Sequence, residues 1–128
     1  MCVKQRFFIC AHCGNMIGLI HDRGVPMVCC GDEMTELVPN TVEASTEKHL
    51  PDVKISGDSI SVQIGSVPHP MDDAHHISFV YMETEHGGQR KCLKAGGEPK
   101  LSFCLTDDKP LAVYAYCNLH GMWKVEIS

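Results

Sequence analysis

The chain has 128 residues, of which 44% are hydrophobic and 21% are charged. This is the composition of a globular protein rather than of a disordered one. The formal net charge of -5 argues against a general nucleic-acid binder, which would present a basic surface. No apolar run is long enough to cross a bilayer, and the first residues lack the apolar core and cleavage site of a signal peptide. We therefore expect a cytoplasmic protein.

Cysteine and histidine are unusually frequent, with eight of each in the chain. Structural disulfides are rare in a reducing cytoplasm, so clustered cysteines there are interpreted first as metal ligands. A secreted disulfide framework would also have an even number of cysteines. The missing export signal and the tight pairing of the cysteines disfavour that alternative.

Residues 1–38 are predicted to form a small domain stapled by a metal, because a segment this short cannot build a stable core alone. Cys10-Ala11-His12-Cys13 is a CxxC pair. After fifteen intervening residues comes the adjacent pair Cys29-Cys30. A CxxC turn directs two thiolates at one ion, and the second pair completes a tetrahedral site that suits zinc and iron alike. We expect His12 to be a solvated turn residue and Cys2 to be a free thiol.

Residues 39–46 are polar and are expected to form a linker or an extended connection. Beyond them the chain is predicted to be β-rich, starting with the clean period-two alternation of residues 59–64. Further strands are expected at residues 77–84, 90–94, 100–106, 111–116 and 122–127. Short strands at this spacing, with turn sequences between them, predict a sandwich or a barrel. Cys92 and Cys104 fall within these strands, and we expect both to be buried as small apolar residues.

A second, scattered set of candidate ligands lies in this β-rich part. Its members are His49, His69, His75, Cys117 and His120. Each is weak evidence alone, because a lone histidine is more often a surface or hydrogen-bonded residue than a ligand. Only Cys117 and His120 have metal-ligand spacing of their own. Most of the set falls at expected loops or strand ends, where a rigid sandwich can present ligands.

The motifs around these residues resemble known iron proteins. The four-cysteine segment resembles desulforedoxin, a small rubredoxin-like protein. Glu47-Lys48-His49, the segment from Gly65 to Met71, His75 and the segment from Tyr116 to Gly121 resemble the centre of the superoxide reductases. Four motifs in this order, over nearly the whole chain, resemble desulfoferrodoxin, the two-iron form of superoxide reductase.

The resemblance implies a mainly β protein with two iron ions. A desulforedoxin-like domain, residues 1–38, would bind the first iron, and an immunoglobulin-like β-sandwich, residues 39–128, would bind the second. The ligands implied for the first iron are Cys10, Cys13, Cys29 and Cys30. Those implied for the second are the equatorial imidazoles of His49, His69, His75 and His120 and the axial thiolate of Cys117. A second histidine, His76, follows His75 directly. Spacing favours His75 as the ligand, and we expect His76 to lie beside the site.

The resemblance also implies a reaction. Five protein ligands leave one octahedral position open, and a thiolate opposite it would push electron density toward a bound dioxygen species. Ferrous iron would reduce superoxide to hydrogen peroxide by one electron, with two protons taken up. Lys48 would attract the anion and help deliver protons, and Glu47 would fill the open position of ferric iron. For an arbitrary Glu-Lys pair the favoured interpretation would be a solvated charge pair.

Partners follow in the same way. The chain has no nicotinamide or flavin motif, so the electron must come from another protein. The resemblance implies a rubredoxin-like donor or another reductase, and a homodimer. No nucleic acid or membrane partner is expected. Two alternatives stay open at this point: an iron protein that only transfers electrons, and a zinc-binding interaction module.

Overall fold

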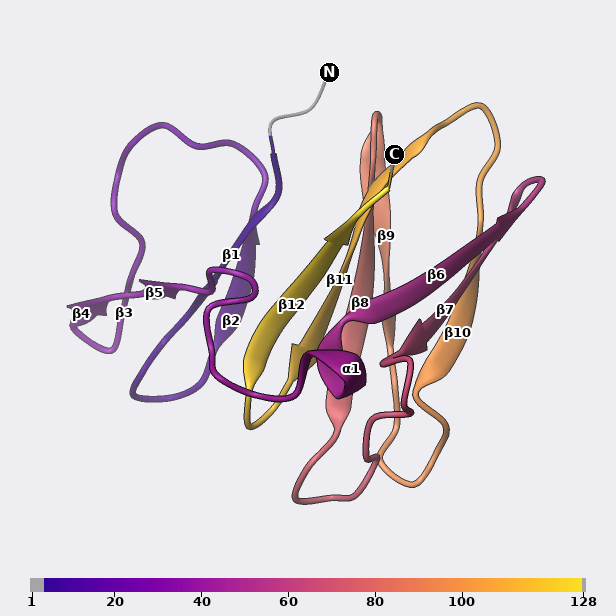
Figure 1. Ribbon diagram of the computed structural model, residues 1–128. Helices are drawn as coiled ribbons and strands as arrows, with labels where there is room; N and C mark the ends of the chain where they lie inside the picture. Colours follow the sequence, from indigo (N-terminus) through magenta and orange to yellow (C-terminus); the bar gives the residue numbers. More distant parts are fainter. Residues whose placement is uncertain (1–3, 128) are drawn as a thin grey trace. The chain divides into compact units, whose positions relative to one another are not determined.

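The computed structural model describes residues 4–127. The chain divides after Val38 into two compact units, here called the N-terminal and the C-terminal unit (Figure 1). In the part of the chain that is described, strands dominate and the one helix is a single turn. No helix there is long and apolar enough to cross a membrane. The predicted mainly β class is confirmed.

The N-terminal unit consists of a small antiparallel sheet, in the order β2-β1-β5, and a hairpin formed by β3 and β4. The strands are β1 (Arg6–Ile9), β2 (Met16–Leu19), β3 (Val28–Cys29), β4 (Asp32–Glu33) and β5 (Thr35–Glu36). Among its described residues only Phe7 and Cys10 are buried hydrophobics, whereas Ile20 is 82% exposed and Val25 is 73% exposed. So small an apolar interior cannot hold a unit together unaided, which agrees with the need for a metal staple.

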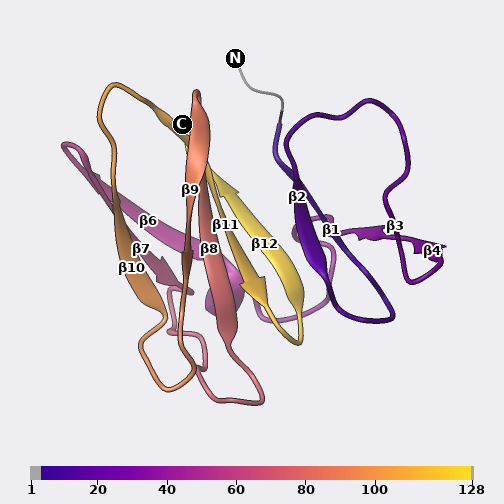
Figure 2. The ribbon, with the colours of Figure 1, turned by 180° about the vertical axis from the view of Figure 1, so that it is seen from behind.

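The C-terminal unit is a sandwich of two antiparallel sheets, in the orders β10-β7-β6 and β12-β11-β8-β9 (Figures 1 and 2). Its strands are β6 (Pro51–Ser56), β7 (Ser59–Ile64), β8 (Ile77–Thr84), β9 (Gly87–Cys92), β10 (Lys100–Cys104), β11 (Pro110–Cys117) and β12 (Gly121–Glu126). The predicted immunoglobulin-like sandwich is confirmed.

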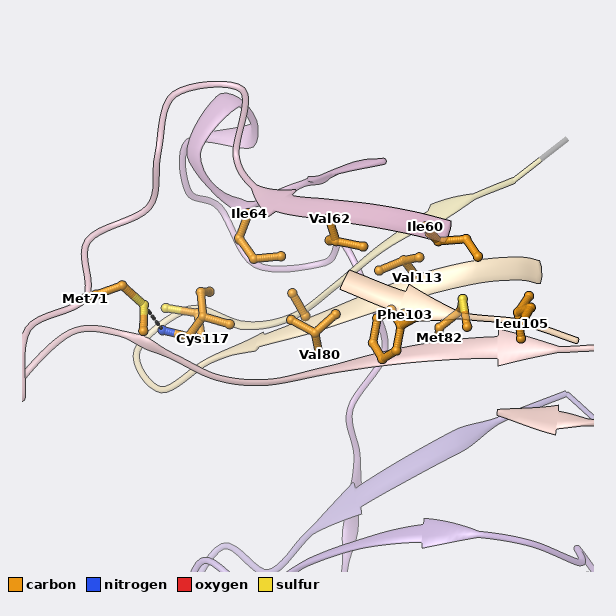
Figure 3. Close-up of a cluster of buried hydrophobic side chains, with 12 residues drawn as sticks. Ile60, Val62, Ile64, Met71, Val80, Met82, Phe103, Leu105, Val113 and Cys117 are labelled. Atoms are coloured by element: carbon orange, nitrogen blue, oxygen red, sulfur yellow. Dashed lines mark hydrogen bonds between the residues drawn. The ribbon is translucent and has the colours of Figure 1, made fainter. Parts of the chain in front are cut away.

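Alternate residues of the strands fill the space between the two sheets. Figure 3 shows Ile60, Val62 and Ile64 of β7 facing Val80 and Val113 of the other sheet. The three β7 residues are all 2% exposed or less. Burying one such side chain stabilises the folded state by about 1.5–3 kcal/mol, so this interior provides a firm base for the loops at its ends.

The sequence pattern predicts some strands better than others. Residues 59–64 and 77–84 are the observed bounds of β7 and β8, whereas the strand predicted at 90–94 begins earlier, at Gly87. The pattern misses β6, which begins with a proline. That strand pairs with β7 along its whole length, from Pro51 opposite Ile64 to Ser56 opposite Ser59. Its partner, rather than its own apolar content, makes it a strand.

The expected linker is tied to the sandwich at Asn40. The side-chain nitrogen of Asn40 donates to the carbonyl of Lys124 at 3.0 Å, and its side-chain oxygen accepts from the Lys124 N–H at 2.9 Å. The backbone N–H of Asn40 donates to the carbonyl of Met122. Residue 40 is therefore an extension of the β12 edge rather than a free connection.

The prediction that Cys92 and Cys104 are buried is wrong, because both are exposed. In β10 the side chain of Phe103 points into the core, so the alternation of a strand turns Cys104 outward. Cys92 lies opposite Phe79, on the face of its sheet turned away from the core. Cys2 lies outside the described residues.

The single helical turn α1 (Thr46–His49) is held by the loop that follows β7. The N–H of Gly65 donates to the carbonyl of Leu50 at 2.9 Å, and the N–H of Val67 donates to the carbonyl of Glu47 at 3.1 Å. Gly65 has a φ of +84°, and a Cβ built there would lie 2.2 Å from the carbonyl oxygen of Val67 and 2.6 Å from that of Lys48. Only glycine fits at this crossing of two backbones.

Gly65→Ala therefore tests how tightly α1 is packed. Gly96→Ala is the matched control, because Gly96 has a similar φ of +89° but open space around its Cβ position. The control should lose about 1–2 kcal/mol from left-handed backbone strain alone. Gly65→Ala should lose about 1–3 kcal/mol more, because backbone atoms must move. The free energy of unfolding by denaturant measures both, and equal losses would contradict the close packing.

Candidate metal centres

Four cysteines gather in the N-terminal unit. The sulfur atoms of Cys10, Cys13, Cys29 and Cys30 all lie within 4.8 Å of one another. The sulfurs of Cys13 and Cys29 are 3.6 Å apart. Four thiols at this separation surround a space of the size that a tetrahedral metal ion needs.

Two tight turns aim these sulfurs at one point. Cys10 and Cys13 belong to the loop between β1 and β2, which is closed by the N–H of Cys10 donating to the carbonyl of Asn15 at 2.8 Å. Cys30 and Gly31 have φ values of 54° and 82° and connect β3 to β4. Two successive positive φ values are typical of a type I′ hairpin turn. The adjacent cysteines thus differ in backbone conformation, which lets both side chains face the same ion.

The acidities of the thiols fit a cation at the centre. The pKa of Cys10 is lowered to about 6, first by the hydrogen bond from the backbone N–H of Cys13. The pKa of Cys30 is raised to about 12, first by hydrogen bonds from its thiol to the sulfurs of Cys13 and Cys10. A thiol that donates a hydrogen bond to a neighbouring thiolate keeps its proton. Around a positive ion, all four thiols would instead ionise.

His12 lies outside this set. Its ring is exposed and interacts with the carboxylate of Asp32, the residue that follows the Cys29–Gly31 turn. His12 is therefore a turn residue as expected, but it is paired with Asp32 and links the two cysteine loops.

The second cluster collects side chains from distant parts of the C-terminal unit. One ligand atom each from His49, His69, His75 and Cys117 lies within 4.8 Å of the others. His49 ends α1, His69 lies in the loop after β7, His75 lies just before β8, and Cys117 ends β11. His49, His69 and Cys117 are at most 3% exposed. The sandwich thus brings four loops or strand ends to one point.

His120 adds a fourth imidazole. Its Nδ1 lies 3.1 Å from Nε2 of His49 and 3.9 Å from Sγ of Cys117. Around the cluster the ring centroids of neighbours lie 4.6 Å (His49–His69), 4.6 Å (His69–His75), 5.1 Å (His75–His120) and 4.9 Å (His120–His49) apart. The diagonal from His49 to His75 is longer, at 6.3 Å. The four rings therefore form a closed group in which each ring lies beside two others.

Two imidazole nitrogens of the cluster lack a hydrogen-bond partner among the described residues. Nε2 of His69 and Nε2 of His75 are buried with no hydrogen-bond partner among the described residues. On the other side of the rings, Nδ1 of His49 lies 2.6 Å from the carbonyl of Ser45, and Nδ1 of His69 lies 2.7 Å from that of Pro70. A ring that donates from Nδ1 presents an unprotonated Nε2, which is the form that binds a metal.

Burial keeps these rings neutral. It is the first cause of the lowered pKa values of His49 and His75, and it lowers the pKa of His69 to about 4. The positive charge of the exposed Lys48, which is next to His49 in the chain, is a minor cause of the lowered pKa values of His49 and His75. The donor set of neutral imidazoles and one thiol suits iron.

Cys117 lies at the end of the hydrophobic core, beside Met71 (Figure 3). It is 0% exposed. The backbone N–H of Ile77 donates to the sulfur of Met71 at 3.5 Å, which closes the core beneath this end of the sandwich. The thiol is therefore screened from water, while Glu47 and Lys48 on α1 are exposed.

The structure distinguishes between the two adjacent histidines. His75 enters the cluster, whereas Nδ1 of His76 lies 3.0 Å from the carbonyl of Asp72. The backbone N–H of His76 is bound by the side chain of Asn118. His76 therefore lies beside the site, turned to the backbone of its own loop.

One supporting residue, Trp123, belongs to the motif that resembles the superoxide reductases but was given no role from the sequence. Its indole stacks on the His49 ring with centroids 4.9 Å apart and planes 26° apart. Its Nε1 donates to the carbonyl of His120 at 3.1 Å. Trp123 thus contacts the ring of His49 and the backbone of His120. Its position three residues after His120 was the available signal, but a lone tryptophan in a strand usually indicates only a core position.

Comparison with known proteins agrees with this geometry. The family model described as Desulfoferrodoxin matches residues 41–126. The desulfoferrodoxin of Nitratidesulfovibrio vulgaris is 38% identical over 123 residues, which cover 96% of this chain and 97% of that protein. The chain belongs to the desulfoferrodoxin family. The family's desulfoferrodoxin from Syntrophotalea carbinolica is 39% identical over 126 residues, with 98% of this chain and 99% of that protein covered.

A solved structure extends the match to the fold. The crystal structure of the superoxide reductase from Treponema pallidum superposes with a TM-score of 0.81 at 35% identity, covering 96% of this chain and 99% of that one. The four-cysteine cluster and the histidine-cysteine cluster correspond to the two iron centres of a desulfoferrodoxin. Two iron ions are therefore the cofactors of this chain.

The unpartnered nitrogen of His75 yields a prediction. His75→Ala should weaken iron binding at the histidine-cysteine cluster by more than the tenfold to hundredfold that loss of a supporting residue costs. His76→Ala is the control and should keep the iron, because Nδ1 of His76 lies against the backbone carbonyl of Asp72 and His76 is outside the cluster. Iron content per chain after dialysis against a chelator measures both, and the reverse result would make His76 the ligand.

A second prediction concerns the four-cysteine cluster. Cys13→Ser replaces a thiol with a harder hydroxyl and should remove the iron of the N-terminal unit together with its visible absorption. The second iron should remain, because the two clusters share no residue. Metal analysis combined with visible spectra of the variant checks this, and loss of both irons would contradict the independence of the two centres.

Proposed function

We propose that this chain is a superoxide reductase, a cytoplasmic oxidoreductase that converts superoxide to hydrogen peroxide. The observation that carries the proposal is the group of four neighbouring imidazoles beside a buried thiol, with the exposed Lys48 next to His49 in the chain. The superoxide reductase named among the similar structures supports the same activity. One electron and two protons added to one superoxide balance to one hydrogen peroxide.

The two clusters support the ligand residues that the family resemblance implies. Cys10, Cys13, Cys29 and Cys30 would hold the first iron. His49, His69, His75, His120 and Cys117 would hold the second. When bound, the second iron would supply the electron for the reaction. The sulfur of Cys117, which is buried, would donate electron density to that iron.

Lys48 is proposed to attract and orient the substrate. Superoxide is an anion, and the chain has a net charge of -5, so the overall field of the protein does not draw it in. The carbonyls of Glu47 and Lys48 are packed against the Gly65 loop, which fixes the backbone from which both side chains extend. The Lys48 ammonium can also pass protons through water toward the product.

Glu47 is proposed to close the site between turnovers. Its backbone carbonyl is held by the N–H of Val67 and by the hydroxyl of Ser66, while its side chain is exposed. With iron bound, the Glu47 carboxylate would be the group on this short turn that binds the ferric ion after the product has left. This role concerns the oxidised state alone.

The electron donor is proposed to be a rubredoxin-like protein or another reductase. The four-cysteine iron is a candidate relay, since iron in a thiolate site changes oxidation state without taking a substrate. We also propose a homodimer. Exposed apolar residues of the N-terminal unit, among them Ile20, Val25 and Val28, are surface that a second copy could bury.

Lys48→Ala tests the proposed activity. Two unit charges about 4 Å apart at an effective dielectric constant of about 20 interact by roughly 4 kcal/mol, and exposure and salt reduce this to roughly 1–2 kcal/mol. The second-order rate with superoxide should therefore fall about tenfold. Lys48→Arg should retain much of the rate, and Glu47→Ala should leave the encounter rate nearly unchanged.

Lys54→Ala is the matched control, because it removes the same charge from an exposed position in β6. Pulse radiolysis at several salt concentrations measures the rates. The wild-type rate should fall as salt rises, and Lys48→Ala should show less of this dependence. Equal rates and salt slopes for the wild type and Lys48→Ala would make Lys48 an ordinary surface charge. If superoxide disappeared no faster with the wild-type protein than without it, the proposed activity would be wrong. The chain would then be an electron-transfer protein.

A further inference from the structure

Asn118 follows Cys117 at the point where β11 ends, and its side chain is exposed. An exposed asparagine normally bonds to water and has little effect on its surroundings. Here all three of its hydrogen bonds go to the two residues that flank His75. The side-chain nitrogen donates to the carbonyl of Ala74 at 3.0 Å, and the side-chain oxygen accepts from the N–H of His76 at 2.8 Å. The backbone N–H donates to the carbonyl of His76 at 3.2 Å.

These bonds lie where the regular pairing of two strands is interrupted. β8 and β11 pair from Val113 opposite Met82 to Tyr116 opposite Phe79, and the register then shifts so that Cys117 lies opposite Ile77. Such a bulge bends the strand and re-aims the side chains next to it. Beyond it the strands no longer form a regular ladder, so another set of bonds must fix their distance.

The loop that carries His75 is folded by its own bonds but needs an anchor. The N–H of Asp72 donates to the carbonyl of His75 at 2.9 Å, and the N–H of His75 donates back to the carbonyl of Asp72 at 3.2 Å. These bonds set the shape of the turn, and the nearest strand pairing beside it is that of Ile77 with Cys117. Asn118 adds a direct tie to the turn, because it is covalently next to Cys117 and bonds to both neighbours of His75.

We infer that Asn118 is a positioning residue that locks His75 against Cys117, so that two of the residues that would hold the second iron are kept at a fixed separation. The inference rests on the proposed function, because it takes His75 and Cys117 as ligands. An asparagine side chain is suited to this role since it carries a donor and an acceptor side by side. Aspartate offers only acceptors, and its charge would face the carbonyl of Ala74.

The test compares Asn118→Ala with Asn40→Ala in the full chain. Asn40 makes the same pair of side-chain bonds, one donated and one accepted, to a single backbone residue of the same unit. That residue, Lys124, is not among the proposed ligands, so the control reports the loss of two such bonds away from the iron. Loss of a group that orients a metal ligand typically costs tenfold to hundredfold in metal affinity.

Asn118→Ala should therefore raise the dissociation constant of the second iron by about tenfold to hundredfold, measured by competition with a chelator. Asn118→Asp should give a smaller rise, because it keeps the acceptor for the His76 N–H. Asn40→Ala should leave the constant within about twofold of the wild type. The four-cysteine iron serves as an internal standard and should not change in any variant.

Amide hydrogen exchange provides a readout that needs no iron. In the wild type the N–H of His76 is bonded to the Asn118 side chain, and in Asn118→Ala its exchange should become at least about tenfold faster. An unchanged iron dissociation constant in Asn118→Ala would overturn the inference, as would an equal rise in Asn40→Ala. If His75→Ala also kept its iron, the proposed ligand set would fail. If His75→Ala lost iron and Asn118→Ala did not, the positioning role alone would fail.

Discussion

Buried imidazole nitrogens without hydrogen-bond partners are the constraint on which the C-terminal unit depends. Nε2 of His69 and Nε2 of His75 face the centre of the cluster with no partner among the described residues. A buried polar group left unpaired costs about 1–3 kcal/mol. A metal ion bound by His69 and His75 would remove this cost at both rings. The free energy of metal binding at this site therefore adds to the free energy of folding.

The sandwich makes this arrangement possible by bringing separate segments to one end. α1, the loop after β7, the turn before β8 and the end of β11 each contribute one member of the cluster, and His120 follows in the turn to β12. Three contacts keep the segments in place. Gly65 lets the backbone of α1 pack against the loop that follows β7. Trp123 stacks on His49, and Asn118 bonds to the residues beside His75. None of these three is itself a proposed ligand.

The two metal clusters are built in different ways. The sulfurs of the first cluster come from two tight turns separated by fifteen residues, and its surroundings are largely exposed. The second spans residues 49–120 and is closed off by a packed core at Cys117. An exposed site held by local turns suits an ion that only changes its charge. A site on a rigid sandwich, with a lysine at its rim, suits the binding of a small anion.

The sequence by itself determined those features that depend on the spacing of residues close together in the chain. The CxxC and adjacent cysteine pairs indicated a metal site, and the alternation of residues 59–64 and 77–84 predicted β7 and β8, because both signals lie within a few neighbouring residues. The second set of candidate ligands was assembled through a family resemblance rather than from spacing. Only the tertiary structure decided that β6 forms and that Cys92 and Cys104 face outward. Each of these depends on which strand lies opposite and in which register, and such long-range pairing leaves no mark on the residues nearby.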